Sequence, residues 1–181
     1  MIAIVGCGAL GSRIALELNG QDLLLWDDDR VEEQNVGTSA YSLHHAGRFK
    51  TAVLSEICAR RGIRAQFTID TLDRGNVKRL SGMSLILDCL DNVPSRTLLT
   101  GLGIPTLHVG VSAEGSGSCL WDHDGYQLPS DGYSRGQNPV CTHQLNAQLL
   151  RMTATVAVGV VEDWLKSGQT RSALVTARQA L

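Results

Sequence analysis

The chain has 181 residues and a formal net charge of −2, with 43% hydrophobic and 19% charged residues. This is the composition of one globular domain. A charge so close to zero gives no electrostatic reason to expect nucleic acid or an anionic membrane as a partner. The aromatic content of 4% also disfavours a surface on which bases stack.

Membrane insertion and secretion are disfavoured by local patterns. The most apolar stretch, around 153–161, is interrupted by Gly159 and closed by Glu162 and Asp163, which leaves it too short to span a membrane. The N-terminus lacks the basic segment that opens a signal peptide. Five cysteines without a C-x-x-C pair indicate neither a disulfide framework nor a Cys₄ zinc site. We therefore expect a reduced, cytoplasmic protein.

Predicted strands and helices alternate along the chain. Short apolar runs predict strands at 2–5, 23–26, 65–69, 85–87 and 106–111, with a further candidate at 117–120. Apolar residues at helical spacing predict helices at 10–18, 46–61 and 94–102. This alternation is typical of a Rossmann-like, doubly wound α/β fold with a mainly parallel sheet.

The remaining segments are polar, or helical at the C-terminal end. Residues 29–45 are predicted to be an irregular connection, and 123–139 a long loop, which at this length is usually functional or disordered. One long helix is predicted over 142–166, and 172–177 fits either a strand or a helix. No linker divides the chain, so we expect a single domain over 1–181.

A G-x-G-x-x-G motif joins the first predicted strand to the first predicted helix. Such glycines permit a tight turn, a close approach of phosphate and close helix packing, and the helix N-terminus attracts the anion. The alternative is a tight corner without a ligand. We expect phosphate contacts from Gly6, Gly8, Ala9, Leu10 and Gly11.

Acidic residues at the ends of two predicted strands indicate which nucleotide is bound. Asp27 ends the second strand, where a carboxylate binds an unphosphorylated ribose, and this disfavours NADP. The acidic run continues to Asp29, and a second pair, Asp88 and Asp91, follows a later strand. Carboxylates near a triphosphate are explained by an intervening Mg²⁺, which favours ATP–Mg²⁺. Solvated acidic turns, or the NAD site of an oxidoreductase, are the alternatives.

Four stretches together resemble the ThiF/MoeB/HesA family of ubiquitin-activating-enzyme-like adenylyltransferases. They are "GCGALGSRIALEL", "LLLWDDDRVEEQNVG", "GRFKTAVLSEI" and "LILDCLDNVPSRTLL", in the family's order and at near-family spacing. The resemblance covers almost the whole chain and implies a mixed sheet and a homodimer. It also implies ATP-dependent adenylylation of a carboxylate at the C-terminus of a ubiquitin-like protein, a sulfur-carrier protein or a peptide.

The resemblance also implies roles for individual residues. By position, Asp27 is similar to the ribose-binding acid and Lys50 to the lysine that reaches the phosphates. Asp91 is similar to the magnesium-binding aspartate, and Arg96 is expected to be structural support. Further cofactor contacts are expected from Asp29, Asn35, Asp88 and Asn92.

Two arginines of the family pattern are absent. Adenylating members carry an arginine in N-x-x-R-Q, whereas Thr38 stands at that place after Asn35. Because the first predicted strand begins at residue 2, we expect the helices that supply a second arginine in many relatives to be missing, and the sequence has no zinc-binding C-x-x-C pair. Arg48, beside Lys50, is the candidate substitute. The alternative is a degenerate member that binds nucleotide or a partner without catalysis.

Cys141 is the candidate nucleophile for a second step. It lies where the long loop meets the long helix, and a helix N-terminus lowers a thiol pKa. Its sequence, "PVCT", resembles the surroundings of the thioester cysteine in eukaryotic activating enzymes. The alternative is an unreactive cysteine at the helix start. The other four cysteines are expected to pack in the interior, and His44, His45, His108 and His123 to lie on surfaces or loops.

Overall fold

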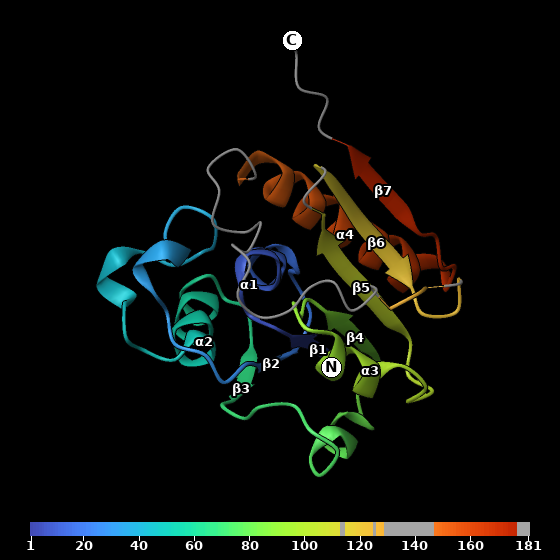
Figure 1. The fold of residues 1–181 in the computed structure, drawn as a ribbon, viewed down its shortest axis with the longest axis horizontal. Coiled ribbons are helices and arrows are strands. Elements are labelled where there is room, and N and C mark those ends of the chain that lie inside the picture. The colour runs from blue at the N-terminus through green and yellow to red at the C-terminus, as the bar shows by residue number, and fades with distance from the viewer. Residues whose placement is uncertain (113–114, 125, 129–146, 177–181) are drawn as a thin grey trace.

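One mixed sheet runs through the molecule (Figure 1). The computed structural model describes residues 1–112, 115–124, 126–128 and 147–176. Within these ranges, seven strands pair in the order β3-β2-β1-β4-β5-β6-β7. Their bounds are β1 Ile2–Val5, β2 Leu23–Trp26, β3 Ala65–Thr68, β4 Leu85–Asp88, β5 Thr106–Val111, β6 Ser116–Trp121 and β7 Ala173–Thr176. The first five are parallel, and β6 and β7 are antiparallel, so the predicted mainly parallel sheet is confirmed.

Strand order changes direction on the two sides of β1. The chain fills the β2–β3 side first and then crosses to β4 and β5 on the other side. In the register, Val5 pairs with Trp26 of β2 and with Asp88 of β4, so the three strands end level with one another. The turns after β1, β2 and β4 therefore meet at one edge. In sheets of this kind, ligands bind at this edge.

Helices cover both faces of the sheet. Their bounds are α1 Ala9–Glu17, α2 Lys50–Arg60, α3 Val93–Leu99 and α4 Ala147–Ser167, with short 3₁₀ helices at η1 Glu33–Asn35, η2 Leu43–His45 and η3 Val77–Leu80. The larger core joins α1, α2 and α4 to the face carrying Ile4 and Leu25, whereas α3 and η3 pack on the face carrying Val5 and Trp26. None of the described helices is long and apolar enough to cross a membrane.

The larger differences from the predicted elements occur at the start of α2, at the end of α3 and at the C-terminal segment, and glycine or tertiary pairing explains them. Helix α2 starts at Lys50 instead of 46, because Gly47 adopts a φ of +82° and Phe49 forms an isolated bridge with Arg30. Helix α3 ends at Leu99, before Gly101 with a φ of +79°. The ambiguous C-terminal segment forms β7 against β6. The long helix is confirmed from 147 onward, whereas most of 123–139 and all of 142–146 lie outside the described residues.

Candidate functional site

In the turn after β1, packing requires glycine at two of the three motif positions, and the third position is open. A Cβ on Gly6, where φ is +92°, would lie 2.7 Å from the Cys89 carbonyl oxygen. A Cβ on Gly11 would lie 1.9 Å from the Gly6 carbonyl oxygen. At Gly8, no atom lies within 4 Å of such a Cβ. The turn therefore packs tightly beneath and leaves room for a ligand above Gly8.

The start of α1 offers backbone donors to that open space. Gly8 is the N-cap residue, and no side chain caps the helix. The first N–H groups of a helix have no partner inside it, and the helix dipole adds partial positive charge there. The arrangement suits a phosphate, as the motif predicts.

Asp27 connects the end of β2 to the glycine turn. Its Oδ2 accepts a hydrogen bond from the Cys7 amide at 2.6 Å, and its Oδ1 accepts one from the Asp29 amide at 2.8 Å. Burial raises the pKa of Asp27 and outweighs the opposing effect of Lys50. The predicted ribose-binding acid therefore lies at the predicted edge, and it also holds the loop in place.

Lys50 is the buried cation of this edge. It is the first residue of α2 and is only 9% exposed, and its Nζ lies 2.7 Å from Asp29 Oδ2. Burial alone would lower the pKa of Lys50, but the carboxylates of Asp27, Asp29 and Asp91 outweigh that effect and raise it. Lys50 is thus a charged ammonium close to the two acidic groups that the sequence singled out.

Tyr41 joins the glycine turn to α2 and was not found by sequence reasoning. It is buried, and its hydroxyl lies 2.6 Å from the Cys7 carbonyl oxygen and 3.3 Å from that of Lys50. The only sequence signal is an aromatic residue in an otherwise polar connection. Its contacts place Lys50 at a set position relative to the turn.

The turn after β4 separates two carboxylates that were predicted to face one crevice together. Asp91 is exposed. Asp88 is fully buried, and its carboxylate accepts from the Leu90 amide at 3.0 Å and lies 2.6 Å from His108 Nδ1. The expectation that Asp88 lies open on the rim is therefore wrong. Asn92 caps α3, because its Oδ1 accepts from the Ser95 amide at 2.9 Å.

Three further predictions concern polar residues that are buried. Arg96 is buried and donates to the Leu90 and Val109 carbonyls, which confirms structural support. His108 was expected on a surface or loop, but it is 1% exposed on β5, because a carboxylate at the end of β4 pairs with it inside. His45 is also buried, in η2, where its Nδ1 lies 3.1 Å from the Ser42 amide.

The carboxylates at this edge are of the chemical type that binds Mg²⁺. Among the described residues, Asp27, Asp28 and Asp29, which follow β2, each offer a carboxylate oxygen within 4.8 Å of the others, and Asp91 follows β4 on the other side of β1. Exposed carboxylates are the usual protein ligands of Mg²⁺, with water and substrate phosphates completing the coordination. Asp91, the residue predicted to bind Mg²⁺, is an exposed carboxylate of this kind.

A family comparison decides what kind of domain this is. The ThiF family model matches residues 1–171. The chain belongs to the ThiF family. It is 29% identical over 133 residues to ubiquitin-like modifier-activating enzyme 5 of Xenopus laevis, a match that covers 61% of this chain and 34% of that protein. The chain thus spans about a third of this curated relative.

Solved structures share the ThiF fold. PaaA matches with a TM-score of 0.70 and 16% identity, over 97% of this chain and 68% of that one. E. coli MccB, in structures with ATP and with MccA, matches with a TM-score of 0.69 and 13% identity, over 97% and 63% of the two chains.

In this ThiF domain, the arginine that contacts the backbone at Thr38 is Arg13. The Arg13 side chain, from α1, donates to the Thr38 carbonyl through Nε at 2.8 Å and to the Gly37 carbonyl through Nη2 at 3.1 Å. The predicted substitute, Arg48, is exposed and pairs with Glu56. Helical side chains lean toward the helix N-terminus, which is the signal that could have indicated Arg13. Asn35 closes the same loop, its Oδ1 accepting from the Glu32 amide at 2.9 Å.

Replacing Arg13 by alanine is expected to lower the free energy of unfolding by about 1–2 kcal/mol, because two or three backbone carbonyls lose their donor. Urea denaturation measures this change. Arg74→Ala, on the exposed connection between β3 and η3, is the matched control and should stay within about 0.5 kcal/mol of wild type. An equal loss in both variants would contradict the anchoring role of Arg13.

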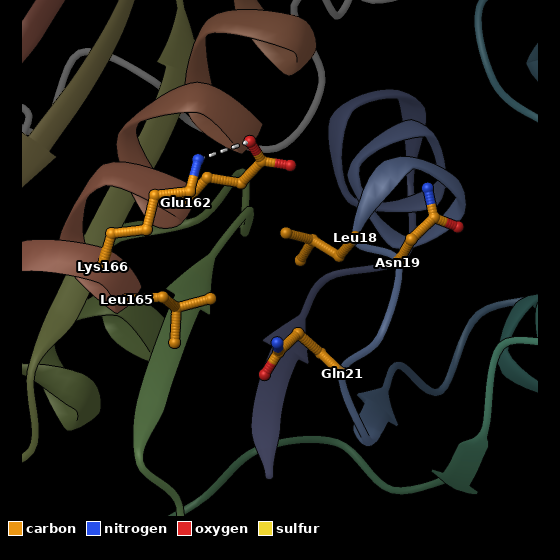
Figure 2. Close-up of a pocket in the computed structure, with 6 residues that line it drawn as sticks. All are labelled: Leu18, Asn19, Gln21, Glu162, Leu165 and Lys166. Carbon is orange, nitrogen blue, oxygen red and sulfur yellow. Dashed lines mark ion pairs between the residues drawn. The ribbon is translucent and has the colours of Figure 1, made fainter.

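The pocket drawn in Figure 2 lies away from this site. Its volume is about 310 Å³, and it lies between the C-terminal ends of α1 and α4, where the Leu18 side chain points toward α4. An ion pair of 3.6 Å between Lys166 and Glu162 borders it. The glycine turn is at the opposite end of α1, so this pocket is not the predicted nucleotide site.

The structure describes four of the five cysteines. Cys141 lies outside the described residues, as does His143. Cys7, Cys58 and Cys119 are buried, and Cys89 is partly exposed. Burial raises the pKa of all four thiols, to about 11 for Cys58 and about 12 for Cys119. The expectation that the buried three pack in the interior is confirmed.

Proposed function

We propose that this ThiF domain binds ATP–Mg²⁺ at the edge formed by the turns after β1, β2 and β4, and uses it to adenylylate a carboxylate. The single observation that carries the proposal is the uncapped start of α1, with open space at Gly8, beside the buried Lys50. A phosphate in that space meets backbone donors on one side and an ammonium on the other.

The chemistry follows from charge. A carboxylate oxygen of the acceptor attacks the α-phosphorus of ATP, the bond to the bridging oxygen of the β-phosphate breaks, and pyrophosphate leaves with an acyl adenylate as the product. Negative charge grows on the phosphate oxygens in this step, and a positioned cation stabilises it. In our proposal Lys50 turns from the exposed Asp29 carboxylate to the phosphates. Mg²⁺ held by Asp91 would supply further positive charge there.

The acceptor and the assembly are part of the same proposal. The name of the Xenopus relative and the MccB structure with MccA support a ubiquitin-like protein, a sulfur-carrier protein or a peptide as the source of the carboxylate. The family resemblance supports a homodimer, which sedimentation analysis measures, and the cysteine pattern supports a cytoplasmic location.

ATP–pyrophosphate exchange tests the proposal. Wild type is incubated with ATP, labelled pyrophosphate, Mg²⁺ and candidate carboxylates, namely proteins ending in Gly-Gly and short peptides. We expect label in ATP only when an acceptor carboxylate is present, and its loss in Asp91→Ala. ATP binding without exchange for any acceptor would instead support a degenerate, nucleotide-binding member, which the absence of an arginine at position 38 favours. Preferential binding of NAD would overturn both.

Thioester transfer to Cys141 is the finer part of the proposal, and thiol labelling tests it. The described thiols have raised pKa values, so at pH 8 they should react with a disulfide reagent at least about tenfold more slowly than a free cysteine. We expect one fast-reacting thiol in the native chain, and its loss in Cys141→Ser. Cys58→Ser is the matched control and should keep the fast phase. A fast phase that persists in Cys141→Ser would contradict the proposed nucleophile.

A further inference from the structure

We propose that His108 is a positioning residue for the Asp91 turn, by which we mean residues 88–92 between β4 and α3. The proposal deepens the function proposed above and rests on it, because it assigns the side chain that orients Asp91 and Asn92. His108 is only 1% exposed, so it does not contact a ligand in the site and acts through its neighbours.

His108 lies between two carboxylates inside the protein. Its Nδ1 is 2.6 Å from Asp88 Oδ2, and its Nε2 is 3.3 Å from Asp122 Oδ1. The ring of Tyr126 stacks on it in parallel, with ring centroids 3.5 Å apart. A carboxylate only accepts hydrogen bonds, so His108 Nδ1 is the donor in its short contact with Asp88. His108 thus ties Asp88 to the segment that follows β6.

Asp88 and Arg96 connect His108 to the Asp91 turn through hydrogen bonds to Leu90. Asp88 Oδ1 accepts from the Leu90 amide at 3.0 Å, while Arg96 Nε donates to the Leu90 carbonyl at 2.8 Å. Both polar groups of Leu90, the residue before Asp91, are therefore bound to buried charged side chains. Arg96 Nη1 in turn donates to the Tyr126 hydroxyl at 3.0 Å.

The charges explain why His108 matters to the turn. Asp88 is fully buried, and the Arg96 guanidinium is farther from its Oδ2 than His108 is, with Nη1 at 3.6 Å. A buried carboxylate that loses its short partner is strongly unfavourable, so it moves toward another donor or toward water. Either movement takes Asp88 away from the Leu90 amide. The backbone that carries Asp91 then loses its set orientation.

Amide hydrogen exchange in the nucleotide-free chain tests the proposal directly. We expect His108→Gln, which donates to only one carboxylate, to speed exchange of the Leu90 amide at least about tenfold. Amides in β1 and β2 should change by less than about twofold. His123→Gln, an exposed histidine on the same segment that contacts Thr170, is the matched control and should leave Leu90 unchanged. Unchanged exchange at Leu90, or equal acceleration at all amides, would overturn the proposal.

A second variant covers the case in which His108→Gln fails to fold. Asp122→Asn removes the partly exposed carboxylate that contacts His108 Nε2, so the His108 ring and its contact with Asp88 are held less firmly. We expect it to speed exchange at Leu90 about threefold without a change in β1. An unaltered Leu90 rate in this variant, or equal acceleration in β1, would again overturn the role of His108.

Nucleotide binding separates this inference from the proposed function. Titration with Mg²⁺–ATP should show about tenfold weaker binding for His108→Gln, but less than twofold further weakening when His108→Gln is added to Asp91→Ala. Independent, additive losses would contradict positioning through the turn. If wild type binds no ATP, the proposed function fails, while the Leu90 exchange rate still decides the role of His108.

Discussion

Replacing Lys50 by methionine is expected to reduce ATP–pyrophosphate exchange by about 100- to 1,000-fold, the loss that follows removal of one preorganised charge from an active site. Methionine keeps most of the length and apolar stem of lysine and removes the ammonium. The carboxylates of Asp27, Asp29 and Asp91 then repel the phosphates without a protein cation between them. Initial rates of label transfer at saturating ATP measure the effect.

Lys166→Met is the matched control, because its ammonium is exposed on α4 and, among the described residues, pairs only with Glu162 across one helical turn. Exchange in this variant should remain within about twofold of wild type, since exposed helix pairs contribute little. Circular dichroism of both variants checks that they are folded. A folded Lys50→Met variant with wild-type exchange would exclude Lys50 from the reaction.

Replacing Gly11 by alanine is expected to cost at least about 3 kcal/mol of unfolding free energy, the largest effect on stability that we expect from one methyl group in this chain. The new Cβ would lie 1.9 Å from the Gly6 carbonyl oxygen and 3.2 Å from Ile4 Cγ2. Since the first of these atoms belongs to the backbone, relief requires the turn to separate from α1. Urea denaturation followed by circular dichroism measures the loss.

Gly8→Ala provides the contrast within the same motif. It adds the same methyl group where no atom lies within 4 Å and φ is −76°, so stability should change by less than about 1 kcal/mol. Nucleotide affinity should nevertheless fall at least about tenfold, because the methyl group occupies the space proposed for phosphate. Equal destabilisation by the two variants, or unchanged ATP affinity in Gly8→Ala, would contradict the proposed division between packing and binding.

The alternation of strands and helices was predictable because it depends on local periodicity. β1 and β2 are short apolar runs with the bounds that the pattern predicts, and β5 agrees as well. Errors occurred where long-range contacts decide a boundary. The start of α2 is set by the bridge between Phe49 and Arg30, and the choice of a strand at the C-terminal end by pairing with β6. Neither partner is near in sequence.

Within the site, the types of residue that follow β1, β2 and β4 were predictable from the sequence. Gly6 and Gly11 were identifiable because only glycine fits their places in this turn, Gly8 because the motif leaves room for phosphate there, and Asp27 because a strand end places it beside the turn. Lys50 and Asp91 followed from the family resemblance. These features depend on spacing along the chain, which a sequence displays directly.

Which polar side chains are exposed and which are buried against another polar side chain depends on the tertiary structure. Asp88 and Asp91 are three residues apart and chemically alike, yet one is buried against His108 and the other is exposed. Likewise, Arg13 rather than Arg48 reaches the Thr38 loop. Burial and pairing depend on which distant segment packs against a side chain, and local periodicity contains no information about that segment.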